Sequence, residues 1–238
     1  MTRHVPLDKT AHRDLRVRTE ASAALGDAVM ATLTVPNEFR NVQGHFPILF
    51  RREPGQGDFV ALALFGFENG KNLFLDGARW DARYRPWSLA IQPFLIGRPE
   101  SGDGPGQVHI DLGHPRIAEG GEGMRVFDED GRATPFLDAI AERLGALDAG
   151  FRASGDFFAA LRDHELLEPF TLEVPLDDGS KHSLVGYHII DEAKLQALDA
   201  VTLGRLHAAG HLMPIFMAIA SLSQFSALVA RKNRARHG

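Results

Sequence analysis

At residues 59–67 the sequence reads Phe-Val-Ala-Leu-Ala-Leu-Phe-Gly-Phe, and Asn69-Gly70 follows after one residue. A short continuous apolar run that ends at turn residues is typical of a buried strand. Asn-Gly is a strong signal for a tight hairpin turn. Because the stretch 72–75 follows this turn directly, we predict a β-hairpin between residues 59–67 and 72–75.

Further strands are predicted on both sides of this hairpin. In the first half, apolar runs predict strands at 46–50, 87–96 and 107–112. In the second half, the runs 172–175 and 183–190 flank Asp177-Asp178-Gly179-Ser180, which predicts another hairpin. The stretches 97–106 and 118–123 are rich in glycine and predict exposed loops.

Helical patterns dominate the chain after residue 134. Thr134-Pro135 combines a capping residue with proline at the first helical position. Apolar side chains then recur at helical spacing from 136 to 147. Further helices are predicted from Ser154, from a cap at Asp191 with Leu195, Leu198 and Val201 facing inward, and from Met213 to Lys232.

These patterns together predict an α+β fold. It consists of a mostly antiparallel β-sheet in the first half plus a hairpin near 170–190, packed against C-terminal helices. The 238 residues suit one large domain or two small ones. The sequence has no repeat of fixed period and no convincing linker, so we predict a single domain over residues 1–238.

The sequence contains no cysteine, which has direct chemical consequences. Thiol catalysis, disulfides, iron–sulfur clusters and cysteine zinc sites are excluded, and the composition agrees with a reducing compartment. The stretch 1–8 lacks the apolar segment of a secretory signal. We therefore expect a soluble, cytoplasmic protein.

Charge and hydropathy bear on the partners of the chain. The net charge of −5 provides no overall basic field for a phosphate backbone, so we expect no nucleic-acid partner. The most apolar segment, Leu212–Leu222, contains Pro214 and is shorter than the roughly 18 residues that a membrane helix needs, so we expect no membrane span. The basic tail Arg231–Arg236 is interpreted as a solvated helix end, with a nucleic-acid or membrane contact as the alternative.

Short segments spread over nearly the whole chain form a recognisable series. They include Val5-Pro6-Leu7, 12–16, 46–50, 64–67, Tyr84-Arg85-Pro86, 93–96, 127–131, 166–169, 191–195 and 210–228. In this order they resemble the SapC-like family of bacterial proteins. The genes of this family often lie beside genes for TonB-dependent receptors, flavin-dependent halogenase-like proteins and cupin-like oxygenases. The resemblance therefore implies a role in the uptake or modification of an external nutrient or peptide.

His109-Ile110-Asp111 has a spacing that suits a metal site. Residues i and i+2 of a strand point to the same side. His109 and Asp111 could therefore share one ion and, with a distal histidine, form the two-histidine, one-carboxylate triad of non-haem iron oxygenases. His182 and His188 are available downstream, and we take His188 as the third ligand, with Fe(II) and 2-oxoglutarate as the cofactors. The alternative is that Asp111 caps a turn or pairs with an arginine.

The stretch 79–87 reads Arg-Trp-Asp-Ala-Arg-Tyr-Arg-Pro-Trp. Arginine, tryptophan and tyrosine dominate binding hot spots. We therefore predict a recognition loop for a peptide, an acidic ligand or a partner protein. Its binding residues are Arg79, Trp80, Arg83, Tyr84, Arg85 and Trp87. The alternative is that the aromatic rings anchor the loop on the core while the arginines reach solvent.

No catalytic residue is predicted from the sequence. His207 and His211 are four residues apart, but Gly210 is expected to break the helix between them. The predicted function is a non-catalytic accessory or binding protein with a protein or peptide partner, associated with TonB-dependent nutrient uptake or peptide modification. The alternative is a non-haem Fe(II)/2-oxoglutarate-dependent oxygenase, or a degenerate relative, that uses His109, Asp111 and a distal histidine.

Overall fold

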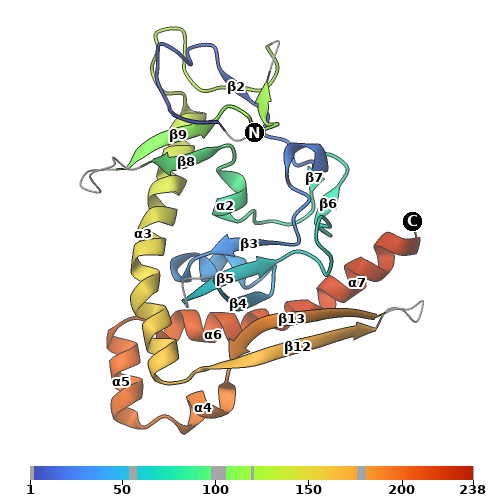
Figure 1. The fold of residues 1–238 in the computed structure, drawn as a ribbon, viewed down its shortest axis with the longest axis vertical. Helices are drawn as coiled ribbons and strands as arrows, with labels where there is room; N and C mark the ends of the chain where they lie inside the picture. Colours follow the sequence, from blue (N-terminus) through green and yellow to red (C-terminus); the bar gives the residue numbers. More distant parts are fainter. Residues whose placement is uncertain (1–2, 54–57, 98–105, 119–120, 176–180, 238) are drawn as a thin grey trace. The chain divides into compact units, whose positions relative to one another are not determined.

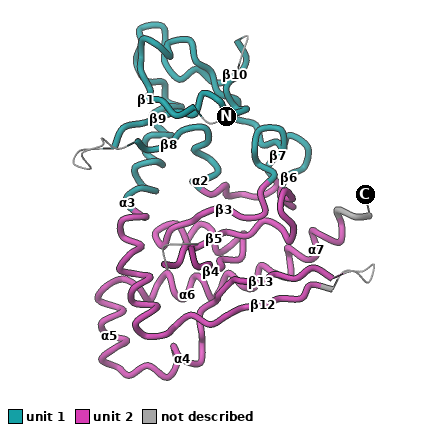
Figure 2. The backbone as a smooth tube through the Cα atoms, in the orientation of Figure 1, with its two compact units in different colours: residues 1–28, 75–80, 87–149 teal, residues 29–74, 81–86, 150–238 magenta. Residues whose placement is uncertain are grey.

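The computed structural model describes residues 3–53, 58–97, 106–118, 121–175 and 181–237. The chain divides into two compact units, each assembled from separate parts of the sequence (Figure 2). Unit 1 comprises residues 1–28, 75–80 and 87–149, and unit 2 comprises residues 29–74, 81–86 and 150–238. The long helix α3 (Pro135–Asp163) begins in unit 1 and ends in unit 2. A single domain over residues 1–238 stays a prediction.

Unit 1 is built from short antiparallel strands. One sheet has the order β1 (His4–Pro6), β9 (Gln107–Asp111), β8 (Phe94–Gly97), and another has the order β10 (Ile117–Ala118), β2 (Arg16–Val17), β11 (Met124–Arg125). β6 (Leu75–Asp76) pairs with β7 (Arg79–Trp80). The 3-10 turn η1 (Ala23–Leu25) and the short helix α2 (Trp87–Ala90) complete these elements, together with the first half of α3.

A buried ion pair holds the loops of unit 1 together. Arg116 is 1% exposed and donates to the carboxylate of Asp27 at 2.5 Å. Its guanidinium also donates to the carbonyl oxygens of Arg18 and Glu20, each at 2.9 Å. Removing one partner would leave an uncompensated charge in the interior. Arg116 therefore has a structural role that its charged character alone does not indicate.

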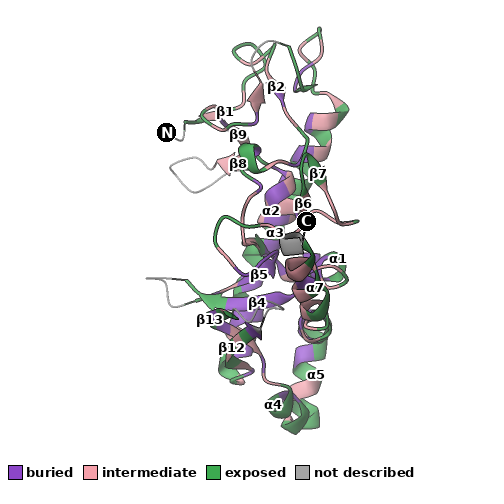
Figure 3. Cartoon of the chain, turned by 90° about the vertical axis from the view of Figure 1, so that its right-hand side faces the viewer, coloured by how far each residue is buried: buried purple, intermediate pink, exposed green. Residues whose placement is uncertain are grey.

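Unit 2 contains a five-stranded antiparallel sheet (Figure 1). Its order is β12 (Leu167–Pro175), β13 (Lys181–Ile190), β4 (Ile48–Arg52), β5 (Phe59–Leu64), β3 (Ala31–Thr34). All residues from Ala61 to Phe67 are buried, as a continuous apolar run requires. Figure 3 shows that β4 and β5 are largely buried, whereas α4 and α5 are mostly exposed. The centre of the sheet is therefore the core of this unit.

Helical elements complete unit 2. They are η2 (Pro36–Glu38), α1 (Phe39–Val42), α4 (Glu192–Ala197), α5 (Ala200–Ala208), α6 (Leu212–Ser221) and α7 (Gln224–His237). Of these, α6 packs against the sheet. Asp191 caps α4 and Asp199 caps α5 through backbone amides three residues later. The buried hydroxyl of Ser221 accepts a hydrogen bond from the Ile48 amide at 2.8 Å, which joins α6 to β4.

The predicted α+β class is confirmed, and the hairpin of β12 and β13 forms where it was predicted. The other hairpin is wrong in its partner. β5 pairs with β4 and β3, whereas Leu75 pairs with Trp80 in unit 1. The two segments predicted to pair on either side of Asn69-Gly70 thus enter different sheets, although Gly70 does form the expected turn at φ +75°. The predicted turn at 176–180 lies outside the described residues.

One further strand prediction and several helix predictions also need correction. The strand predicted at 87–96 begins with the helix α2 and becomes extended only at Phe94. Ser154 does not open a helix, because its hydroxyl bonds back to the Gly150 carbonyl within a continuous α3. Val201 does not face inward and is 65% exposed. The long C-terminal helix is interrupted after Ser221, so that α6 and α7 are separate helices.

One stretch of the described residues, Leu212–Arg234, is long and apolar enough to cross a membrane by length and composition. The sequence analysis did not expect such a stretch. The first of its two helices, α6, buries Pro214, Ile215, Met217 and Ala218 within unit 2. A helix that packs into the core of its own unit meets the same compositional criterion as a membrane helix.

The first two residues of the basic tail, Arg231 and Lys232, are not solvated, which corrects the prediction for this part of the tail. Arg231 donates to the carboxylate of Asp81 at 2.6 Å and to its carbonyl oxygen at 2.9 Å. Its guanidinium also lies 4.3 Å from the centre of the Phe74 ring. Lys232 donates to Glu68, and only 12% of the Lys232 side chain is exposed. The start of the tail is therefore attached to unit 2.

Candidate binding site

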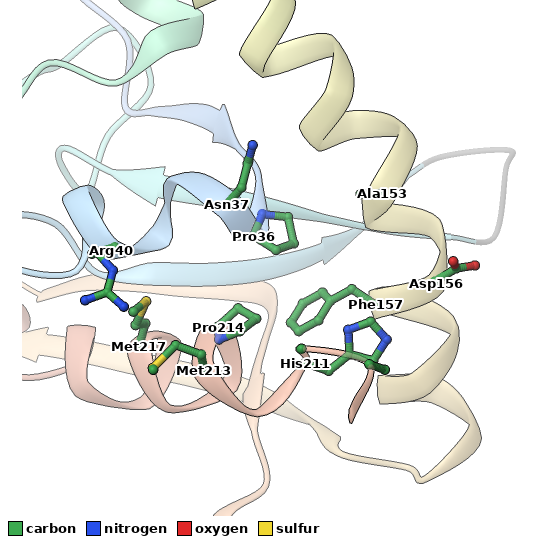
Figure 4. A pocket seen from close by; sticks show the side chains of 12 residues that line it. Pro36, Asn37, Arg40, Ala153, Asp156, Phe157, His211, Met213, Pro214 and Met217 are labelled. Atoms are coloured by element: carbon green, nitrogen blue, oxygen red, sulfur yellow. The ribbon is translucent and has the colours of Figure 1, made fainter. Parts of the chain in front are cut away.

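A cavity of about 430 Å³ lies within unit 2 (Figure 4). Three parts of the chain line it: the η2–α1 segment, the second half of α3, and the turn from α5 into α6. The lining residues are Pro36, Asn37, Arg40, Ala153, Asp156, Phe157, Ala209, Gly210, His211, Met213, Pro214 and Met217. A volume of roughly 300–1,000 Å³ is typical of sites that bind small ligands.

Apolar side chains form most of the cavity wall. Phe157 and Pro214 are buried, whereas Met213 is 56% exposed. The His211 ring meets the Phe157 ring edge to face, with 5.7 Å between the ring centres. Gly210, at φ +76°, ends α5 and turns the chain into α6, which brings His211 to the cavity. The α5–α6 turn thus contributes both polar and apolar atoms to the wall.

Arg40 supplies the positive charge of the cavity. It is an exposed residue of α1 and the only arginine or lysine among the lining residues. Among the described residues it forms no ion pair and no side-chain hydrogen bond. Figure 4 shows Asp156, the only acidic lining residue, pointing away from Arg40 on the far side of α3. The guanidinium is therefore available to a bound anion.

A buried hydrogen-bond network fixes the segment that carries Asn37 and Arg40. Glu38 lies between them in the sequence and is fully buried. Its carboxylate accepts hydrogen bonds from the hydroxyls of Thr34 and Tyr84, each at 2.7 Å. A buried carboxylate is tolerated only when such donors replace its lost water. These two hydrogen bonds thus fix the backbone of the η2–α1 segment.

Gly150 allows this segment to approach α3 closely. A Cβ atom at Gly150 would lie 2.5 Å from the Asn37 Oδ1 and 2.7 Å from a methyl carbon of Val35. Contacts of this length do not occur between real side chains, so only glycine fits without movement. Gly150 therefore sets the distance between two walls of the cavity.

The family model of SapC matches residues 7–228. The chain belongs to the SapC family. No curated protein and no solved structure matches the chain. The match covers both units of this SapC-family fold, including all the residues that line the cavity.

The predicted recognition loop of this SapC-family chain is divided between the units. Arg79, Trp80 and Trp87 belong to unit 1, and residues 83–85 belong to unit 2. Tyr84 is half-buried and anchored to Glu38, and Pro86 is buried, whereas Arg79 and Arg83 are exposed. At Tyr84 the structure agrees with the anchoring alternative. Binding by Arg79, Trp80, Arg83, Tyr84, Arg85 and Trp87 stays a prediction.

The predicted metal ligands have other contacts. Asp111 Oδ1 accepts hydrogen bonds from the backbone amides of Arg3, at 2.7 Å, and Gly113, at 2.9 Å, as expected for a carboxylate that caps a turn. These hydrogen bonds lower the pKa of Asp111, and the one from Arg3 has the largest effect. His109 lies against Gly97 of the neighbouring strand β8, where a Cβ atom would come within 2.1 Å of its ring. Both residues therefore have structural roles in unit 1.

His188 lies in unit 2, where its ring meets the Phe59 ring edge to face with 4.9 Å between the ring centres. No group of three or more His, Asp or Glu residues in the described part of the chain could hold a metal ion. The predicted iron site, with its 2-oxoglutarate, stays a prediction that no cluster of ligands supports.

Proposed function

We propose that this SapC-family chain is a non-catalytic accessory or binding protein that acts in TonB-dependent nutrient uptake or peptide modification, and that its ligand site is the cavity of unit 2. The observation that supports this proposal best is the cavity itself. It combines a mostly apolar wall with a few polar groups, which is the usual composition of a ligand site.

The lining residues support binding rather than covalent catalysis. None of them is a serine, threonine, cysteine, lysine or tyrosine, the residue types that most often act as nucleophiles. His211 contacts the Phe157 ring and forms no hydrogen bond or ion pair with Asp156, the acidic lining residue, among the described residues. A histidine without a neighbouring acid or nucleophile lacks the partners that general acid–base chemistry uses. Binding is the function that this arrangement serves best.

The test fills the cavity without disturbing the core. Ala153 is an exposed residue of α3 that lines the cavity, so Ala153→Trp places a large ring in it. Ala141→Trp makes the same change at an exposed position of α3 outside the cavity. Each variant and the wild type are purified from the native bacterium under gentle conditions. Native mass spectrometry then measures bound small molecules or peptides.

We expect a ligand on the wild type and on Ala141→Trp, and its loss from Ala153→Trp with the melting temperature retained. Retention of the same ligand by Ala153→Trp would place the site elsewhere. Finding no ligand on any of the three proteins would count against a binding function for the cavity. Transport assays on a deletion strain, with Ala153→Trp as one complementing allele, test the link to nutrient uptake.

A further inference from the structure

We infer that the cavity selects a carboxylate carried on an apolar body, with Arg40 binding the carboxylate. This inference rests on the proposed function and names the chemical class of its ligand. It follows from the charge of the cavity, from the shape of its charged group and from the composition of its wall.

The charge of the cavity favours a monoanion. Arg40 is its only arginine or lysine and, among the described residues, has no acidic partner. The carboxylate of Asp156 points away from Arg40 in Figure 4. One positive charge balances one carboxylate, whereas a phosphate dianion would retain excess charge beside an apolar wall. Arg40 is exposed, so a second negative charge would be partly solvated, but it would have no second arginine or lysine beside it among the described lining residues. A carboxylate therefore matches the charge of this site better than a phosphate.

The geometry of a guanidinium also suits a carboxylate. Its N–H donors lie in one plane and can bind the two oxygens of a carboxylate as a bidentate pair; they can bind a phosphate in the same way, so the charge of the site decides between the two anions. The backbone beneath Arg40 is fixed by the hydrogen bonds of Glu38 to Thr34 and Tyr84. Because this backbone is already fixed, only the side chain of Arg40 must be ordered when a carboxylate binds. Arg40 is therefore the group that selects the head of the ligand.

The rest of the wall recognises the body of the ligand loosely. Met213 and Met217 come from successive turns of α6, and Phe157 faces them from α3 (Figure 4). Methionine side chains are flexible and polarizable, and they adapt to apolar groups of different shape. We therefore expect the cavity to accept aromatic and aliphatic bodies alike, provided that each carries a carboxylate.

The five methionines of the chain provide a direct probe of occupancy. With 13C-labelled methyl groups, Met213 and Met217 report on the cavity, and Met30 and Met124, which do not line it, serve as internal references. The signals are assigned with Met213→Leu and Met217→Leu. The protein is titrated with 3-phenylpropionate and with the neutral 3-phenylpropionamide. Two further titrations use a short peptide that ends in phenylalanine, with a free carboxylate or with a C-terminal amide.

We expect the acid to shift the Met213 and Met217 signals and to bind at least about tenfold more tightly than the amide, as a charge-assisted hydrogen bond warrants. Arg40→Met should remove this preference. Arg143→Met changes an exposed arginine of α3 outside the cavity and should retain it. The two peptides then identify whether the natural carboxylate belongs to a peptide end or to a free organic acid. A preference for the free carboxylate points to a peptide end, and peptide binding too weak to measure points to a free organic acid.

Equal affinity for acid and amide, or a preference that survives Arg40→Met, would overturn the inference. So would the absence of any shift at Met213 and Met217. None of these results alone decides the proposed function, because the ligand retained from the native cell and its loss in Ala153→Trp are measured separately. A retained ligand without a carboxylate would leave the binding function standing and contradict only the chemistry assigned to Arg40.

Discussion

Tyr84 illustrates how a residue type typical of binding sites can serve the core. Its hydroxyl lies 2.7 Å from the carboxylate of Glu38, a fully buried acid. The bond links residue 84 to the η2–α1 segment, 46 residues earlier in the sequence. A tyrosine so placed fixes the backbone that carries Arg40, the residue to which we assign the bound carboxylate.

We predict that Tyr84→Phe lowers the free energy of unfolding by about 1–3 kcal/mol, because one carboxylate oxygen loses a donor in a buried site. The ring is conserved in size, so its packing contributes little to the loss. Chemical denaturation monitored by circular dichroism measures the change. Arg83→Ala, at an exposed position next to it, should alter stability by less than about 0.5 kcal/mol. Equal effects of the two substitutions would show that the Tyr84 hydrogen bond is not stabilising.

His188 makes the stability of the chain depend on pH. Burial, and secondly the positive charge of Arg52, lowers the pKa of His188 below its usual value. Its Nδ1 is buried without a hydrogen-bond partner among the described residues. As pH falls through the ordinary histidine pKa of about 6.5, the unfolded chain binds a proton that the folded chain does not. The stability present above that pH is therefore lost as pH falls toward the lowered folded pKa.

The corresponding variant is His188→Phe, which retains an aromatic ring against Phe59 and cannot titrate. We predict that the wild type loses more unfolding free energy than His188→Phe between about pH 7.5 and about pH 5.5. Some dependence should remain in the variant, because burial also lowers the pKa of His45 and of His114. Urea denaturation at both pH values measures the difference. Parallel losses in the two proteins would contradict this role of His188.

At the scale of elements, α3 contains two glycines with opposite expected effects. A Cβ atom at Gly150 would collide with Asn37 and Val35, whereas one at Gly155 would meet nothing within 4 Å. Both positions lie in the part of α3 that belongs to unit 2. Alanine substitutions at these two positions therefore distinguish two effects on stability. At Gly155 only the helix propensity changes, whereas at Gly150 the close contact with the cavity wall changes as well.

We predict that Gly155→Ala stabilises the chain by roughly 0.5–1 kcal/mol, since alanine is the better helix former. Gly150→Ala should destabilise it instead, because an overpacked contact costs about 1–3 kcal/mol. Displacement of the η2–α1 segment should also change the Met217 methyl signal. Thermal unfolding and the same labelled spectra measure both effects. A stabilising Gly150→Ala would mean that the segment moves away from α3 at no cost.

Local signals predicted single elements well and their partners less well. Asp191 and Thr134-Pro135 marked true helix starts, because a cap depends on residues within one turn. The apolar run at 59–67 marked a true strand. Its partner was wrong, because Asn69-Gly70 specifies a turn without specifying which strands continue beyond it. Strand pairing depends on packing across the sheet, which a local pattern does not contain.

The cavity could not be predicted in the same way. Its walls come from residues 36–40, 153–157 and 209–217, which only the folded chain brings together. The stretch 79–87 attracted the prediction because its arginines and aromatics are adjacent in sequence. A usable signal was present at Gly210, whose expected helix break did place His211 at the start of α6. Nothing in the sequence connected that turn to Arg40.

At the scale of the whole molecule, the C-terminal helix closes unit 2 onto earlier parts of the chain. Arg231 binds Asp81 and lies over Phe74, and Lys232 binds Glu68. Glu68 also lies 3.3 Å from His182 of β13. The hydrogen bond from Lys232 is the main cause of the lowered pKa of Glu68. Residues more than 140 positions apart are thus joined by two adjacent cations.

We therefore predict that deleting residues 231–238 destabilises the chain, whereas deleting residues 235–238 does not. The longer deletion removes both ion pairs and the ring contact and leaves Asp81 and Glu68 without these cations. These pairs are partly buried, with 24% of the Arg231 side chain exposed, so solvent screens them less than a surface pair. Hydrogen bonds to charged groups of this kind contribute roughly 1.5–3 kcal/mol each before screening is considered.

We expect the longer deletion to lower the free energy of unfolding by about 1–3 kcal/mol in total, which corresponds to a melting temperature lower by roughly 2–4 °C per kcal/mol in a chain of this size. Arg231→Met with Lys232→Met should reproduce most of the loss without shortening the helix. Equal melting temperatures for the wild type, the two deletions and the double substitution would show that these contacts stabilise nothing and that the tail is the solvated end its composition first indicated.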